Sequence, residues 1–174
     1  TEVLIHSGLV QKVAGTPGND TLTADLGKIM GGYILEGGEG SDTLVIRDGS
    51  GNGTVLAAGF AGLHGGGGTD SLVLDANNTK LDLRGLTGET FTGIETINIA
   101  GGSGNSVILD ASIFTANTGM EPGAVLTITG NAGDKYELDG SVWVYDSLDG
   151  AFHVYTNGSD TLKVQADMTR VQHA

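Results

Sequence analysis

The sequence predicts an all-β fold in which short strands stack as an interrupted parallel β-solenoid, or β-roll, closed at one end by an antiparallel β cap. Three observations lead to this prediction. Glycine supplies 31 of the 174 residues and proline only 2, which indicates many tight turns with positive φ. Short runs rich in β-branched residues and leucine lie between the glycine clusters, as strands do. The glycine clusters also repeat one pattern, which indicates a structural repeat.

The runs predicted as strands share this composition and are bounded by Gly, Asp or Asn. They are 43–47, 71–75, 80–83, 96–99, 106–109, 125–129, 141–145, 152–155 and 161–164. Helical periodicity is nearly absent. A single helical turn is expected within 110–116, and 22–30 is a second candidate for a short helix.

Three copies of the pattern Gly-Gly-x-Gly-x-Asp-x-apolar-x begin at Gly15, Gly37 and Gly65, and only the first departs from it, at Thr16. A degraded fourth copy runs over 101–109 with Ser106 in place of the aspartate, and a fainter fifth begins at Gly130 with Gly133 and Asp134. If each copy starts a new coil, the apolar residues after the turns should stack in register. The row would contain Leu22, Leu44 and Leu72, with Ile108 continuing it.

This organisation divides the chain into a lead-in strand or linker over 1–12, the solenoid over 13–124, the cap over 125–168 and a tail over 169–174. The cap prediction rests on Asn157-Gly158, a strong signal for a tight hairpin, and on the aromatic residues gathered in this part. An antiparallel cap would cover a sheet edge that is otherwise open.

Composition excludes several classes of function. With 21 acidic and 8 basic residues the formal charge is −13, which disfavours binding to nucleic acid or to anionic membranes. No apolar run is long enough to span a bilayer, so membrane insertion is not expected. The absence of cysteine excludes disulfides and thiolate metal sites. Residues 1–13 lack the features of a signal peptide, and we expect the chain to be a piece of a longer protein.

The three loops have the chemistry of calcium sites. Calcium takes about six to eight oxygen ligands from carboxylates, carbonyls and water, and glycine turns can direct several carbonyls inward. One loop would supply half of the ligands and its neighbour the rest, which predicts two ions: one between the loops ending in Asp20 and Asp42, and one between those ending in Asp42 and Asp70. The alternative is ordinary turns, in which Gly and Asp are common, but the repetition favours calcium. The predicted ligand positions are Gly15, Pro17, Gly18, Asp20, Gly37, Glu39, Gly40, Asp42, Gly65, Gly67, Gly68 and Asp70.

A separate candidate lies at Asp48, Ser50 and Asn52, which resemble the start of an EF-hand loop. Position twelve of that loop would be Gly59 and not glutamate, so a surface turn is the favoured interpretation.

No residue pattern indicates catalysis, and we expect no enzyme activity. The histidines are scattered, Glu36 and Glu39 flank a turn and are better explained as solvated charges than as acid–base partners, and no phosphate-binding loop is present. Trp143 and the nearby tyrosines could form a platform for a sugar, although packing is the favoured role.

The nonapeptide pattern is the signature of RTX proteins, and this chain resembles that family. The copies at Gly37 and Gly65 match it at every defined position, although the copies here are interrupted and do not follow one another directly. The stretch 91–97, Phe-Thr-Gly-Ile-Glu-Thr-Ile, and Val154 to Gly158 are similar to segments of giant RTX adhesins. The resemblance implies export by the type I secretion machinery of a Gram-negative bacterium, a secreted or cell-surface location, and neighbouring domains in a longer chain.

The expected function is therefore a calcium-binding structural module of a secreted adhesin. It would fold when it binds calcium outside the cell, and it would support surface attachment and biofilm formation. Two alternatives remain: a module that binds a carbohydrate or a protein partner, and an accessory domain of a secreted RTX enzyme.

Overall fold

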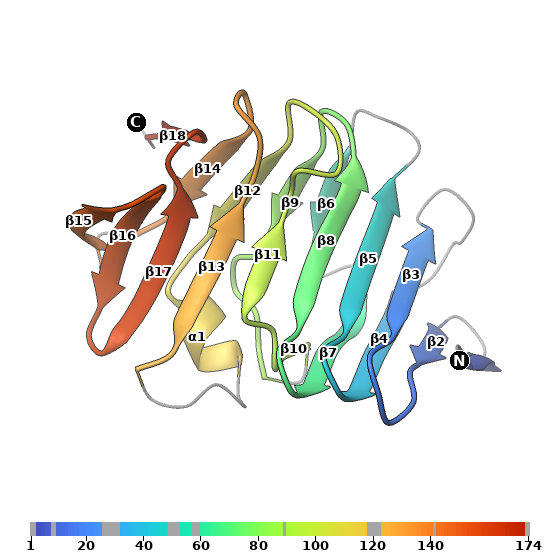
Figure 1. Ribbon diagram of the computed structural model, residues 1–174. Helices are drawn as coiled ribbons and strands as arrows, with labels where there is room; N and C mark the ends of the chain where they lie inside the picture. Colours follow the sequence, from blue (N-terminus) through green and yellow to red (C-terminus); the bar gives the residue numbers. More distant parts are fainter. Residues whose placement is uncertain are drawn as a thin grey trace.

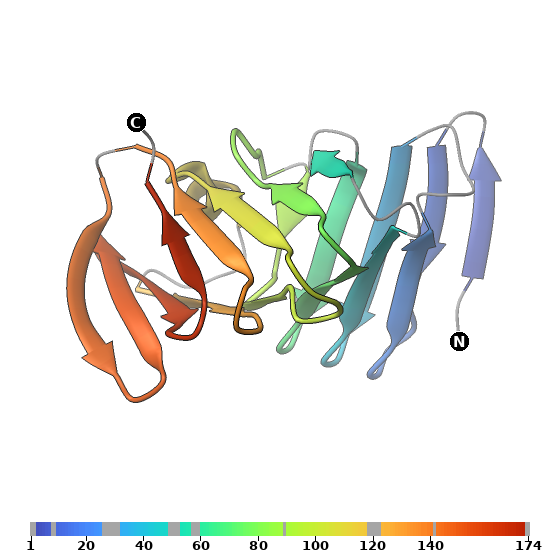
Figure 2. The same cartoon turned by 90° about the horizontal axis from the view of Figure 1, so that it is seen from above.

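The computed structural model describes residues 3–7, 10–25, 32–48, 53–56, 60–88, 90–117, 123–140 and 142–172. In this part of the chain the strands form three sheets, and the one helix is the short α1 (Ser112–Ala116). Figures 1 and 2 show the strands following one another along the molecule, from the N-terminus at one end to the C-terminus at the other.

The first sheet has five strands. β1 is antiparallel to β2, and the other neighbours pair in parallel. In spatial order they are β1 (Val3–Ser7), β2 (Val10–Ala14), β4 (Gly32–Glu39), β7 (Phe60–Gly67) and β10 (Phe91–Thr92).

The second sheet has eight strands and faces the viewer in Figure 1. Its first three strands form an antiparallel meander, and the others pair in parallel. In spatial order they are β15 (Val144–Asp149), β16 (Phe152–Asn157), β17 (Asp160–Gln165), β13 (Val125–Thr129), β11 (Thr96–Asn98), β8 (Ser71–Ala76), β5 (Thr43–Asp48) and β3 (Thr21–Asp25).

The third sheet is parallel throughout. In spatial order its strands are β18 (Thr169–Val171), β14 (Lys135–Leu138), β12 (Ser106–Leu109), β9 (Lys80–Asp82) and β6 (Thr54–Leu56). The chain visits the three sheets in turn, as in β7, β8 and β9, and each new pass lies beside the one before it.

The predicted solenoid or β-roll is wrong. The fold consists of three sheets, two of them mixed, and they do not close into a solenoid. In the described residues the first sheet gains no strand after β10, and α1 follows β12 where a further pass would begin. The antiparallel cap over 125–168 is also wrong in its first part, because β13 and β14 pair in parallel with their neighbours.

The predicted strands are present except the one over 141–145, where β15 begins only at Val144, and α1 lies within the expected 110–116. The second helix candidate, 22–30, is wrong over 22–25, because these residues belong to β3. Its remaining residues, 26–30, lie outside the described residues. The described part contains no helix long and apolar enough to cross a bilayer.

A ladder of aliphatic side chains runs through the second sheet and forms much of the core. The register pairs each member with the next, and each is fully buried. Burying such a side chain contributes about 1.5–3 kcal/mol relative to leaving it exposed. The members are Leu22, Leu44, Leu72, Ile97, Ile128 and Val164. The predicted continuation at Ile108 is wrong, because this residue lies in the third sheet opposite Asp82 and Glu137.

Candidate functional site

The three predicted glycine loops lie side by side, at the edge where the chain passes from the first sheet to the second. They precede β3, β5 and β8, at the lower edge of Figure 1. The strands that follow them pair in register, with Thr21 beside Thr43 and Thr43 beside Ser71. The twelve predicted ligand positions therefore lie in three neighbouring loops along one edge.

Close approach of the loop backbones explains the glycines of the motif. Gly66 and Gly68 have φ of +108° and +130°, which disfavours residues with a Cβ. A Cβ on Gly66 would overlap the backbone of Gly38, and a Cβ on Gly68 would overlap that of Gly40. The pattern is thus required by the stacking of one loop on another.

Carboxylates tie each loop to the one before it. Asp42 Oδ1 accepts a hydrogen bond of 2.8 Å from the backbone N–H of Asp20. Asp70 Oδ1 accepts one of 2.7 Å from the N–H of Asp42. Glu95 Oε2 accepts one of 2.7 Å from the N–H of Asp70. We call Asp20, Asp42, Asp70 and Glu95 the carboxylate row.

Sequence reasoning missed Glu95 as a member of this row. The turn from β10 to β11 contains one glycine, Gly93, so an alignment of glycine clusters does not detect it. A different signal was available: an acidic residue, a hydroxyl residue and an aliphatic residue follow one another at each position. The four triplets are Asp20-Thr21-Leu22, Asp42-Thr43-Leu44, Asp70-Ser71-Leu72 and Glu95-Thr96-Ile97.

Two oxygens of this row are buried without a hydrogen-bond partner. Asp42 and Asp70 are each 1% exposed, and the Oδ2 atom of each is unpaired among the described residues. Burying an ionised oxygen without compensation costs several kcal/mol or more, so such atoms require an explanation.

The surroundings of the two oxygens are alike. A Cβ placed on Gly37 would overlap both Asp42 Oδ2 and the carbonyl oxygen of Gly65. A Cβ placed on Gly65 would overlap both Asp70 Oδ2 and the carbonyl oxygen of Gly93. Each carboxylate oxygen therefore lies close to a carbonyl oxygen of the next pass and accepts no hydrogen bond from the described residues. A cation or a proton is needed to balance such an arrangement.

The first position of the row differs. Asp20 Oδ2 accepts hydrogen bonds from the backbone N–H of Thr16 at 2.6 Å and from its hydroxyl at 2.8 Å. The backbone donor is the largest of the effects that lower the pKa of Asp20 to about 2. Thr16 is the single departure of this copy from the motif, and it satisfies the oxygen that is unpaired in the next two copies.

Electrostatics distinguish Asp70. Burial raises the pKa of this carboxyl above its usual value, and the negative charges of Glu95 and Asp42 raise it further, against the opposing hydrogen bond from the N–H of Asp42. The ionised form is therefore disfavoured unless a positive charge lies close by.

Two predicted ligand side chains do not reach these oxygens. Pro17 and Glu39 are exposed. The carbonyl of Glu39 accepts a hydrogen bond from Gly18 N–H, and that of Gly67 accepts one from Gly40 N–H. Backbone contacts between the loops thus occupy these positions.

The degraded fourth and fifth copies belong to another edge of the fold, where the second sheet passes to the third. The aspartate position there is filled by Asn105 and not by Ser106. Asn105 Oδ1 accepts the N–H of Thr79 at 3.0 Å, and Asp134 Oδ1 accepts that of Asn105 at 2.9 Å. Asp134 Oδ2 accepts the N–H of Asn131 at 2.7 Å. This row is satisfied by backbone donors.

The EF-hand-like candidate is only partly visible. Asp48 ends β5 and accepts a long hydrogen bond of 3.5 Å from the hydroxyl of Thr79. Ser50 and Asn52 lie outside the described residues.

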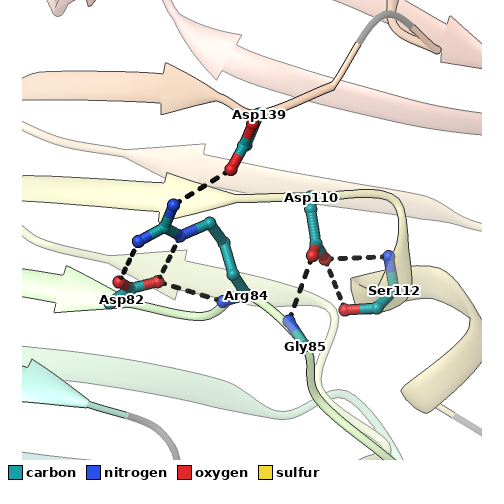
Figure 3. A network of polar contacts seen from close by, with 6 residues as sticks. All are labelled: Asp82, Arg84, Gly85, Asp110, Ser112 and Asp139. Atoms are coloured by element: carbon teal, nitrogen blue, oxygen red, sulfur yellow. Dashed lines mark hydrogen bonds and ion pairs between the residues drawn. The ribbon is translucent and has the colours of Figure 1, made fainter. Parts of the chain in front are cut away.

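Charged side chains beside the third sheet form a network of polar contacts around Arg84 and Asp110 (Figure 3). Arg84 pairs with Asp82 at 2.7 Å and with Asp139 at 3.0 Å, and it lowers the pKa of Asp82. Asp110 accepts hydrogen bonds from the N–H groups of Gly85 and Ser112. We assign this network to holding the turn after β9.

The aromatic residues mainly pack. Trp143 is 9% exposed and packs on Phe114 at 5.8 Å between ring centroids. Tyr145, on the outer strand β15, is 50% exposed and contacts Tyr155 at 5.5 Å. Tyr145 is therefore the more accessible ring.

Among the described residues, no three acidic or histidine side chains gather into a metal-binding group. A cation at the carboxylate row would therefore depend on backbone carbonyls as well. Comparisons of the chain with known families, with curated proteins and with solved structures gave no match.

Proposed function

We propose that this chain is a calcium-binding structural module whose folding depends on the ion. The observation that carries the proposal is Asp42 Oδ2, which is buried, unpaired and close to the carbonyl of Gly65. This oxygen lies between two complete copies of the motif. The oxygens brought together there are those of a carboxylate and a backbone carbonyl, which suit a hard cation such as calcium and not a softer metal.

The position of the ion supports a structural role. It would bridge two loops that each join the first sheet to the second, so binding free energy would become folding free energy. Without the ion, the carboxylates of the row would repel one another, and the negative charge on the buried oxygens would have no positive charge beside it.

The biological setting is proposed from the sequence resemblance. Two complete nonapeptides support an RTX protein exported by type I secretion, and the adhesin-like segments support a role in surface attachment. Calcium outside the cell would then complete the fold after export.

The test is a calcium titration of chelator-treated protein, followed by circular dichroism and thermal unfolding, with bound ions counted by native mass spectrometry. Calcium should increase β-structure or the melting temperature, and Asp42→Asn should lose one ion. Asp167→Asn removes a charge at an exposed turn far along the sequence from the loops and should behave as wild type. Identical melting with and without calcium, and no bound ion, would refute the proposal.

A second candidate, binding of a carbohydrate or a protein partner, is favoured by the outer strand β15. Val144, Tyr145 and Leu148 are each at least half exposed there. Glycan-array screening with Tyr145→Ala as the test variant would detect sugar binding. Trp143→Ala is less suitable because that ring is buried.

A further inference from the structure

We propose that the chain holds a calcium ion beyond its last nonapeptide, between the Asp70 loop and the turn 93–95 that ends in Glu95. The inference rests on the proposed calcium binding and adds a site that the repeat pattern does not contain. Its basis is Asp70 Oδ2, which is buried and unpaired in a residue that is 1% exposed, and which lies close to the carbonyl of Gly93.

The turn is built to present that carbonyl. The side chain of Asn117, 1% exposed and next to the end of α1, accepts the N–H of Ile94 at 3.1 Å and donates to its carbonyl at 2.6 Å. The carbonyl of Gly93 and the N–H of Ile94 belong to one trans peptide, so they point in opposite directions. Asn117 holds the N–H on one side and thereby directs the Gly93 oxygen to the other.

Glu95 gives this turn the charge that an aspartate gives the other loops. Its Oε2 atom accepts the N–H of Asp70, as Asp70 Oδ1 accepts the N–H of Asp42. No ion pair to a basic side chain involves Asp42, Asp70 or Glu95 within the described residues. Three neighbouring carboxylates thus lack a positive charge.

The ions are therefore displaced along the row relative to the sequence prediction. No ion is required between the first two loops, because Thr16 donates twice to Asp20 Oδ2. One ion lies at Asp42 Oδ2, between two nonapeptides, and one at Asp70 Oδ2, between a nonapeptide and a turn without one. The total remains two, so an ion count alone does not test the placement.

The experiment compares four variants of the full chain by native mass spectrometry and calorimetry with calcium. Asn and Gln keep an acceptor for the N–H that each carboxylate holds and remove only the charge. Wild type should bind two ions. Glu95→Gln should lower the affinity for the ion at Asp70 on the order of 10–100-fold. Asp70→Asn should lose this ion, whereas Asp42→Asn should retain it. Asp20→Asn should still bind two ions.

The outcomes separate this inference from the proposed function. If wild type binds one ion, and this ion is lost in Asp42→Asn and unaffected by Glu95→Gln, the inference would be overturned while calcium binding would stand. If wild type binds two ions and Asp20→Asn loses one of them, the inference would also be overturned, because that ion would then lie between the first two loops. Binding of no ion would overturn both. If Asp70→Asn does not fold, Glu95→Gln still decides, because its carboxyl is only partly buried.

Discussion

Contact between stacked loops can be tested with two glycines at the same position of the motif. Gly18 and Gly68 both have positive φ, +142° and +130°, so alanine at either position should cost about 1–3 kcal/mol in backbone strain. A Cβ on Gly18 meets nothing within 4 Å, whereas one on Gly68 overlaps the carbonyl oxygen of Gly40. Because a backbone atom cannot rotate away, overpacking should add about 1–3 kcal/mol to Gly68→Ala alone.

The assay is thermal unfolding with saturating calcium. For a chain of this size 1 kcal/mol corresponds to about 2–4 °C. Gly68→Ala should therefore melt roughly 2–12 °C below Gly18→Ala, and both should melt below wild type. Equal losses in the two variants, or a larger loss in Gly18→Ala, would show that the third loop does not rest on the second as described.

Three further predictions concern acid, the first loop and the core. The pKa of Asp70 is raised in the folded state, so the calcium-free protein takes up a proton on folding. Its stability should therefore increase as pH falls through that pKa towards 3.8. The melting temperature of calcium-free Asp70→Asn should lack this increase. The folded pKa of Asp20 is lowered, so its stabilisation is present above about pH 4 and is lost as pH falls towards 2; Thr16→Val, which removes one donor, should make acid unfolding less steep over this range. Leu72→Ala should cost about 2–5 kcal/mol in denaturant unfolding, whereas Leu148→Ala, at a side chain 58% exposed, should stay within about 0.5 kcal/mol of wild type.

The local pattern predicted most strands of the second sheet, and β9 and β12 of the third, because their alternation of apolar residues is visible in the sequence. It missed β3, β6, β14 and β18. It did not predict β4 and β7 as strands. These two include the first glycines of the motif, such as Gly37 and Gly65, and glycine has low strand propensity. Here the glycines are required by the close approach of the next pass, which only the three-dimensional register reveals.

The site was predicted in part for a similar reason. Alignment by glycine clusters brought together the loops that stack, and it also included 101–109, which lies on another edge. Glu95 was omitted because its turn contains one glycine and is held instead by Asn117, a residue 22 positions after Glu95 in the sequence. The state of each carboxylate depends on neighbours such as Thr16, so the number of motif copies does not fix which positions need an ion.

The hydrogen bonds of the carboxylate row all run the same way: each side chain reaches back to the amide of the preceding pass. The dependence of one loop on another is therefore opposite to the order of the chain. Asp20 has its amide held only when Asp42 is in place, Asp42 relies on Asp70, and Asp70 relies on Glu95. The later part of the chain thus acts as a template for the earlier part, and assembly of this edge is expected to spread from the C-terminal side towards Asp20, whose own carboxylate turns back to Thr16 and ends the series.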